Sequence, residues 1–142
     1  MAKSRNMTVD DIIIVASLIE REAKKPEERA TIASVIYNRL NSNETAKLLQ
    51  IDASIQYIFL NRDGKIKEKL LDNDLETLDP YNTYKNKGLP PGPICSPGEE
   101  SIKAALDPAK TSYYYYVAKG DGSHVFAKTL KEFEDAKKKY VK

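Results

Sequence analysis

Residues 79–98 read D-P-Y-N-T-Y-K-N-K-G-L-P-P-G-P-I-C-S-P-G, and they are the stretch from which the fold is predicted. This segment holds five of the seven prolines and three of the six glycines. Proline lacks an N–H and fixes φ, so these residues exclude a helix or a central strand. A long irregular run inside a compact domain is usually disordered or functional. The apolar side chains that could anchor this segment favour order, and they are Tyr81, Tyr84, Leu89 and Ile94. The sequence therefore predicts an ordered loop that forms one wall of a binding cleft.

The end of this segment carries a signal for the start of a helix. Ser96 and Glu99 have the spacing of a capping box, in which each side chain accepts a hydrogen bond from the other residue's backbone N–H. Pro97 between them suits the first helical position. The sequence therefore predicts a helix that begins at Pro97 and ends at Asp107–Pro108.

Two helices are predicted in the first part of the chain. Thr8 is the predicted N-cap of a first helix that runs to about Lys24. Apolar residues occupy nearly all sides of its first two turns, so this helix is expected to be buried. Pro26 opens a second helix, which ends near Asn41. Little more than two lysines joins the helices, so they are expected to pack closely.

The remaining segments predict shorter elements. A short strand is expected at Leu48–Ile51, and Asp52 and Ser54 are expected to cap a helix that includes Phe59. Residues 65–78 are charged and are expected to be partly helical. The fold class is predicted as α+β, with several helices packed around a small antiparallel sheet and the long Pro/Gly-rich loop lining the cleft. The sheet is predicted as a hairpin of two strands, Tyr113–Ala118 and His124–Lys128. A second capping box, formed by Thr129 and Glu132, starts a C-terminal helix.

Length and composition limit the classes of protein that fit. A chain of 142 residues is expected to form one domain, with residues 1–7 a remnant or linker and residues 8–142 the single domain. The net charge of +2 and the lack of a basic stripe argue against nucleic-acid binding. One cysteine and one histidine make an internal disulfide impossible and a Cys/His metal cage unexpected. No apolar run approaches the length of a membrane span.

One candidate for catalysis is a glutamate at the end of the first helix. Glu20 lies at the border of the apolar stripe, above the small residues Ala16 and Ser17. An apolar setting raises the pKa of a carboxylic acid, which suits a general acid that cleaves a glycosidic bond. Hydrolases of that kind need a second carboxylate, for which Asp52 and Asp79 are available.

The alternative is that Glu20 has no catalytic role and is an ordinary surface residue at the edge of the apolar stripe. It would then pair with Arg21 or Lys24 on the helix surface. Glu22 lies on the other edge of the stripe, near Val15 and Leu18, and is the weaker candidate.

A second candidate is a cysteine nucleophile. Cys95 lies next to a predicted helix N-terminus, where thiolates are stabilised. His124 is the only imidazole that could serve as its base. The alternative is that Cys95 is a small buried side chain, because free cysteine is among the most buried residue types.

Several segments, taken in chain order, are similar to the catalytic region of the YceG-like family. They are A-S-L-I-E-R-E-A at Ala16–Ala23, V-I-Y-N-R-L at Val35–Leu40, L-Q-I-D at Leu49–Asp52, the loop at Pro80–Gly98, S-I-K-A-A-L-D-P at Ser101–Pro108, Y-Y-Y-V-A at Tyr114–Ala118 and H-V-F-A-K-T-L at His124–Leu130. The chain departs from the family pattern at Ala53–Ser54 and at Lys119.

The resemblance implies an enzyme that acts on peptidoglycan. Members of the family are endolytic lytic transglycosylases, which cleave the bond between N-acetylmuramic acid and N-acetylglucosamine and leave 1,6-anhydro-muramic ends. Their essential glutamate acts first as an acid and then as a base, and it matches Glu20, the first glutamate of S-L-I-E-R-E. That reaction needs no water and no second catalytic carboxylate, although some group must stabilise the charge on the sugar ring.

The resemblance also carries expectations about binding and location. No cofactor is expected, and the expected partners are peptidoglycan glycan strands and cell-wall synthesis proteins, with no nucleic acid and no membrane contact by this fragment. The parent protein is expected at the extracytoplasmic face of the bacterial cell membrane, anchored by an N-terminal transmembrane helix absent from this chain. A non-catalytic peptidoglycan-binding module is the alternative. Aromatic, amide and hydroxyl groups suit sugars, and the candidates for holding them are Gln50, Asp52, Tyr81, Asn82, Thr83 and Tyr84.

Overall fold

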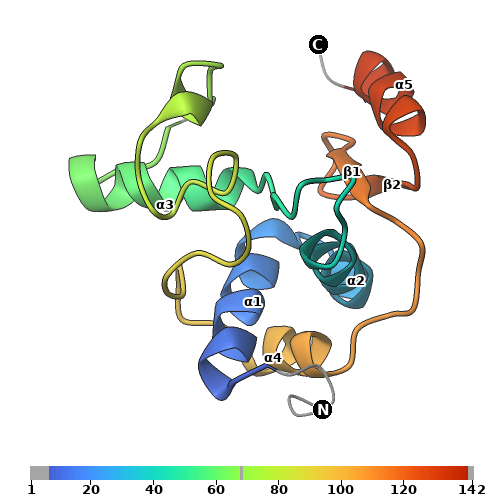
Figure 1. The fold of residues 1–142 in the computed structure, drawn as a ribbon, viewed down its shortest axis with the longest axis horizontal. Coiled ribbons are helices and arrows are strands. Elements are labelled where there is room, and N and C mark those ends of the chain that lie inside the picture. Colours follow the sequence, from blue (N-terminus) through green and yellow to red (C-terminus); the bar gives the residue numbers. More distant parts are fainter. Residues whose placement is uncertain (1–6, 68, 141–142) are drawn as a thin grey trace.

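The computed structural model describes residues 7–67 and 69–140. Within these residues the chain is α+β and mostly helical, with five α-helices and one two-stranded antiparallel sheet (Figure 1). None of the helices in this described part combines the length and apolarity needed to cross a membrane. The α-helices are α1 Val9–Glu22, α2 Arg29–Leu40, α3 Asp52–Asp63, α4 Glu99–Leu106 and α5 Leu130–Tyr140; the strands are β1 Tyr115–Ala118 and β2 His124–Ala127; the 3₁₀ turns are η2 Pro26–Glu28 and η3 Asp74–Glu76.

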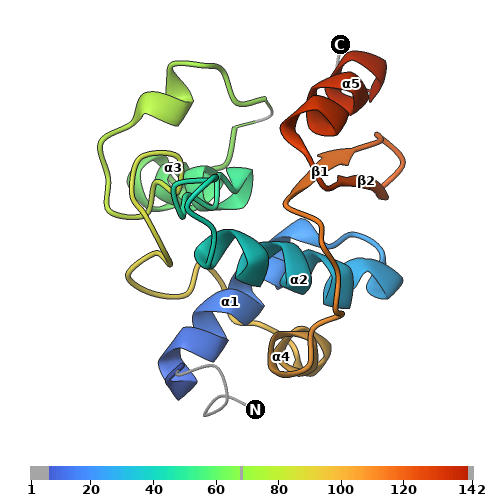
Figure 2. The ribbon, with the colours of Figure 1, turned by 45° about the vertical axis from the view of Figure 1, so that its right-hand side comes forward.

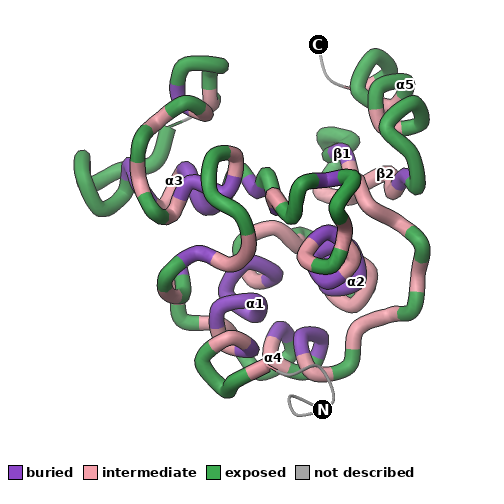
Figure 3. The backbone as a smooth tube through the Cα atoms, viewed as in Figure 1, coloured by how far each residue is buried: buried purple, intermediate pink, exposed green. Residues whose placement is uncertain are grey.

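Helix α1 is the centre of the core, as its all-round apolar pattern predicts. It begins with a capping box, in which the Asp11 N–H donates to Thr8 Oγ1 at 3.0 Å and the Thr8 N–H donates to Asp11 Oδ2 at 3.1 Å. The predicted N-cap is therefore confirmed. Helices α2, α3 and α4 all pack against α1, and Figure 3 shows the buried residues concentrated on these four helices. The fully buried side chains of Leu18 and Ile19 lie at this centre.

The sheet does not form the core, and in this respect the predicted arrangement is wrong. The hairpin pairs Tyr115 with Ala127 and Ala118 with His124, and it lies at one end of the helical cluster, on the side away from α4 (Figures 1 and 2). A sheet of two short strands has too little apolar surface to organise a domain. Helix α5 begins with the predicted Thr129 cap, since the Glu132 N–H donates to Thr129 Oγ1 at 3.1 Å.

Two local predictions between α2 and the loop are wrong, and a third is met only by a 3₁₀ turn. The predicted strand at Leu48–Ile51 is irregular, because Gln50 has a φ of +52°. Helix α3 begins at Asp52 with neither predicted side-chain cap, since the Ser54 hydroxyl donates to the Ile51 carbonyl instead. The segment 65–78 contains only η3 among its described residues.

The Pro/Gly-rich segment has no helix or strand before α4, as predicted, and two buried side chains fix its path. Asn82 donates from Nδ2 to the carbonyls of Leu75 and Thr77. The Thr83 hydroxyl accepts the Ile51 N–H at 2.8 Å. Buried polar groups need such partners, and these bonds tie the loop to α3 and η3.

Candidate active site

Glu20 holds the start of α4 in place. Its Oε1 atom accepts hydrogen bonds from the Gly98 N–H at 2.8 Å and from the Ser101 hydroxyl at 3.0 Å. Gly98 is the N-cap of α4, so the predicted capping box of Ser96 and Glu99 is wrong: a glutamate from α1 supplies the acceptor. A Cβ atom on Gly98 would lie only 3.2 Å from Glu20 Oε1, and the glycine thus permits this close approach.

The electrostatic environment of Glu20 is the opposite of the one predicted. The hydrogen bonds from Gly98 and then Ser101 hold the pKa of Glu20 below its ordinary value, and the positive charge of Arg29 acts in the same direction. The predicted raised pKa is therefore wrong, because donors outweigh burial here. Glu20 is suited to remain an ionised structural acceptor.

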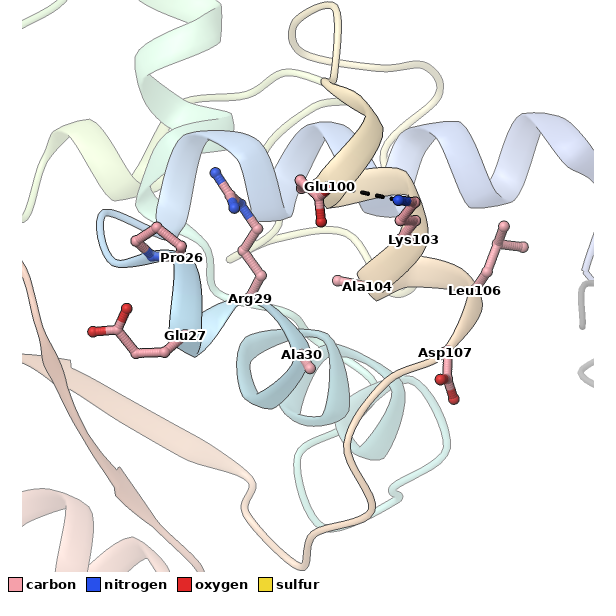
Figure 4. A pocket seen from close by; sticks show the side chains of 9 residues that line it. All are labelled: Pro26, Glu27, Arg29, Ala30, Glu100, Lys103, Ala104, Leu106 and Asp107. Atoms are coloured by element: carbon pink, nitrogen blue, oxygen red, sulfur yellow. Dashed lines mark hydrogen bonds and ion pairs between the residues drawn. The ribbon is translucent and has the colours of Figure 1, made fainter.

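An open hollow of about 600 Å³ lies on the Arg29 side, between η2 and α4. Figure 4 shows Arg29 in this hollow together with Lys103, which pairs with Glu100. Charges of both signs line the hollow, and no site residue predicted from the sequence is among the lining residues. The hollow therefore contains none of the candidate catalytic or sugar-holding residues.

Removal of the Glu20 carboxylate is expected to loosen α4. Glu20→Ala should lower the free energy of unfolding by about 1–2 kcal/mol, the range for losing a helix cap and its partner's bond. Urea denaturation at neutral pH measures this loss. An unchanged free energy of unfolding would show that the two hydrogen bonds contribute nothing to stability.

A cleft of about 430 Å³ lies on the other side of the helical core. Glu22 from the end of α1, Arg39 from α2 and Asp52 from α3 line it, together with Tyr84 of the Pro/Gly-rich segment. One wall comes from the segment after α3, and the opposite wall comes from the hairpin and α5; Figure 2 shows these two regions on opposite sides. The further lining residues are Val35, Leu49, Gln50, Leu70, Leu75, Tyr114, Tyr115, Tyr116, Val117, Ala118, His124, Phe133 and Lys137.

Glu22 has the properties that the sequence argument assigned to Glu20. It is partly buried, and the Tyr116 hydroxyl donates to its Oε1 at 2.7 Å. The pKa of Glu22 is raised to about 7: burial raises it most, the hydrogen bond from Tyr116 lowers it, and the negative charge of Asp52 raises it. A carboxyl with this pKa can both donate and accept a proton near neutral pH.

A second carboxylate shares the cleft. The Tyr84 hydroxyl donates to Asp52 Oδ1 at 2.5 Å. Burial and then the charge of Asp52 raise the pKa of Tyr84 above its ordinary value, so the phenol remains protonated as a donor. Arg39 lies beside them with its guanidinium bonded to the carbonyls of Leu48 and Tyr114. The cleft thus contains a proton donor, an ionisable carboxylate and a fixed cation.

The structure divides the predicted sugar-holding residues into two groups. Gln50, Asp52 and Tyr84 line the cleft, whereas the other three are not among its lining residues. Asn82 and Thr83 are fully buried, and Tyr81 lies against Tyr57 with ring centroids 4.9 Å apart. Their contacts give these three residues a role in holding the loop.

Sequence reasoning missed most of the wall formed by the hairpin and α5. The tyrosine run was interpreted only as a strand, although alternate residues of a strand face one side and could have indicated an aromatic surface. Arg39 is not among the candidate residues that the sequence indicates. Its burial, with 6% of the residue exposed, could not be predicted from the helical pattern.

The cysteine candidate lacks the environment it needs. Burial and then the charge of Glu20 raise the pKa of the Cys95 thiol, so the expected stabilised thiolate is wrong. Cys95 donates to the Ser17 carbonyl at 3.4 Å, and it does not line the cleft that contains His124. The imidazole Nδ1 of His124 instead lies 2.8 Å from Glu28 Oε1.

Within residues 7–67 and 69–140, no cluster of three or more His, Cys, Asp or Glu side chains is arranged to hold a metal ion. The polar and charged groups that line the cleft are carboxylates, phenols, an imidazole, an amide and cations, which can transfer protons and form hydrogen bonds.

Comparison with known proteins places this chain in a family. The chain is 48% identical over 139 residues to the endolytic murein transglycosylase of Bacillus subtilis, covering 98% of this chain and 37% of that protein. It is 37% identical over 123 residues to the endolytic murein transglycosylase of Streptococcus pneumoniae, covering 82% of this chain and 21% of that protein. The chain thus spans about a third or less of the curated relatives it matches.

A solved structure and a family model agree with these relatives. The crystal structure of a YceG-like protein from Listeria monocytogenes superimposes with a TM-score of 0.82 at 41% identity, over 95% of this chain and 42% of that one. The model of the YceG-like family matches residues 1–139. The chain belongs to the YceG-like family.

Proposed function

We propose that this chain is the catalytic domain of an endolytic peptidoglycan lytic transglycosylase, with Glu22 as its acid and base. The names of its relatives support the reaction class. The observation that carries the assignment is the position of Glu22 in a cleft with a pKa raised to about 7. A general acid works best when its pKa lies near the operating pH.

The same observations disfavour Glu20, which the resemblance had singled out. Both glutamates lie at the end of α1, but two helical residues are separated by about 200° around the axis, so they face opposite sides. Glu20 faces the start of α4, where Gly98 and Ser101 bind its carboxylate. Glu22 faces the cleft that holds Gln50, Asp52 and Tyr84.

The proposed reaction needs only one proton-transfer group. Protonated Glu22 gives its proton to the oxygen that joins muramic acid C1 to the next sugar, the C1–O bond breaks, and its electron pair leaves with that oxygen as a hydroxyl. The C6 hydroxyl of the same muramic acid then bonds to C1 and gives its proton to the Glu22 carboxylate. The glutamate ends as it began, and no water is consumed. The products are a free hydroxyl end and a 1,6-anhydro end.

The cleft walls support a polymeric substrate. Aromatic faces of the hairpin and Tyr84 suit sugar rings, and Gln50 adds an amide for sugar hydroxyls. The Pro/Gly-rich loop would form one wall through Tyr84. Peptidoglycan lies outside the cell membrane, so the parent protein is proposed to act on the extracytoplasmic face as an anchored enzyme beside cell-wall synthesis proteins.

Incubation of purified cell-wall sacculi with the chain tests this function. Soluble muropeptides with 1,6-anhydro ends, identified by mass spectrometry, are the expected result. The alternative is a peptidoglycan-binding module that holds glycan strands without cleaving them. Sedimentation of the chain with sacculi and no soluble product would support that alternative.

The Tyr116 hydroxyl is expected to set the pH range of activity. Its hydrogen bond lowers the pKa of Glu22, so Tyr116→Phe should raise that pKa. Cleavage requires protonated Glu22 and falls as the pH rises through its pKa. The alkaline limb of the pH–rate profile should therefore move to higher pH in the variant, by about one unit or less. A limb that moves to lower pH, or stays in place, would contradict this assignment.

A further inference from the structure

Asp52 is held in the cleft by more than its own side chain. It is the first residue of α3, where the helix dipole favours a negative charge. The Tyr84 hydroxyl donates to its Oδ1 at 2.5 Å, which fixes one oxygen of the carboxylate. The carboxylate itself is exposed to solvent, so a ligand in the cleft can reach it.

The backbone fixes Asp52 and Tyr84 relative to each other. The Gln50 N–H donates to the Thr83 carbonyl at 3.2 Å, and the Ile51 N–H donates to Thr83 Oγ1 at 2.8 Å. These bonds join the two residues that precede Asp52 to the residue that precedes Tyr84. Gln50 has a φ of +52°, a conformation that costs energy for a residue with a side chain. The segment around Asp52 is thus held in one geometry before any substrate binds.

Asp52 differs from the other groups of the cleft in having a negative charge that is free to stabilise a positive one. As the glycosidic bond breaks, positive charge develops on the sugar ring at C1 and the ring oxygen. Arg39 and Lys137 line the cleft with the wrong sign to stabilise it. Glu22 is occupied with the proton transfer. Asp52 is the remaining carboxylate among the described residues that line the cleft.

We propose that Asp52, held by Tyr84, is a second catalytic residue, whose carboxylate stabilises the positive charge that develops on the muramic acid ring. The proposal rests on the proposed function and adds to it. Asp52 forms no covalent bond and moves no proton, so the proton transfers of Glu22 are unchanged. Tyr84 is a positioning residue, because it acts through the carboxylate that it holds.

The test uses soluble, uncrosslinked glycan strands and compares Asp52→Asn with Asp63→Asn, a matched control at the exposed far end of α3. Loss of a preorganised charge in an active site costs about 10²–10³ in kcat. Asp52→Asn should therefore lower kcat by about that factor with little change in KM, and Asp63→Asn should match the parent. Tyr84→Phe should lower kcat by about three- to tenfold, the effect of one hydrogen bond.

The pH profile supplies a readout that a merely structural role would not move. The charge of Asp52 contributes to the raised pKa of Glu22, so Asp52→Asn should shift the alkaline limb of the remaining activity to lower pH, opposite to Tyr116→Phe. The other groups that face Glu22 or line the same cleft are unchanged in this variant: Lys24, Arg39, Tyr84, Tyr116, His124 and Lys137.

Several results would overturn the role of Asp52. An Asp52→Asn variant with normal kcat, a loss confined to KM, or a lower kcat with an unmoved alkaline limb would each do so. In all three cases the parent still cleaves glycan strands and Glu22→Gln does not, which leaves the proposed function standing. If the parent produces no cleavage, or Glu22→Gln cleaves normally, the proposed function itself fails.

Discussion

Glu22→Gln is expected to reduce peptidoglycan cleavage by at least about a hundredfold, whereas Glu20→Gln should leave the rate within about threefold of the parent. Glutamine has nearly the same shape as glutamate but cannot give or take the proton. At position 22 this removes the cleft group whose pKa is raised to about 7. At position 20 the amide oxygen can still accept the bonds from Gly98 and Ser101.

The pair of variants forms its own control. The substitution is the same, the two positions lie in the same turn of α1, and only the face of the helix differs. Rates of release of soluble muropeptides from sacculi measure both, and circular dichroism verifies that both variants fold. Loss of activity in Glu20→Gln with retention in Glu22→Gln would contradict the assignment and restore Glu20 as the acid.

Glu22→Gln is also expected to make the protein more stable above pH 7. The pKa of Glu22 is raised from 4.5 to about 7 in the folded protein. Between these values the folded state keeps the proton and the unfolded state has lost it, so the parent loses stability as the pH rises through this window. A shift of this size corresponds to on the order of 3 kcal/mol. Glutamine does not ionise, and the variant avoids this loss.

The pH dependence distinguishes this effect from ordinary repacking. At pH 8, urea denaturation should show a higher free energy of unfolding for Glu22→Gln, and near pH 4 the difference should vanish. Glu20→Gln should instead show a lower free energy of unfolding than the parent at pH 8. The lowered pKa of Glu20 contributes stability above the unfolded pKa, and this stability is lost as the pH falls. An equal difference at both pH values, or a destabilised Glu22→Gln at pH 8, would contradict the raised pKa of Glu22.

Elements with strong local signals were predictable from the sequence. The Thr8 cap, the all-round apolar α1, the Pro26 start and the tyrosine-rich hairpin each depend on neighbouring residues, and the structure confirms them. The capping box at Ser96 failed because the acceptor for α4 comes from Glu20, far away in sequence. Local spacing cannot reveal a partner that only the fold supplies.

The residues of the candidate site could not be predicted from local spacing either. Helical periodicity places Glu20 and Glu22 on opposite borders of one apolar stripe, and it assigns no neighbour to either. The pKa of Glu22 depends on Tyr116 from the hairpin and Asp52 from α3, which reach it only through tertiary packing. The sequence likewise could not show which loop residue lines the cleft, because burial separates Tyr84, which lines it, from Asn82 and Thr83.

The most direct test of the proposed mechanism is the fate of water oxygen during cleavage. Sacculi are digested with the chain in water enriched in heavy oxygen, and the new sugar ends are read by mass spectrometry. Internal attack by the muramic acid C6 hydroxyl predicts anhydro ends without the label, formed by the parent and Glu20→Gln but not by Glu22→Gln. Reducing ends that carry heavy oxygen would show hydrolysis and would contradict a single glutamate acting as both acid and base.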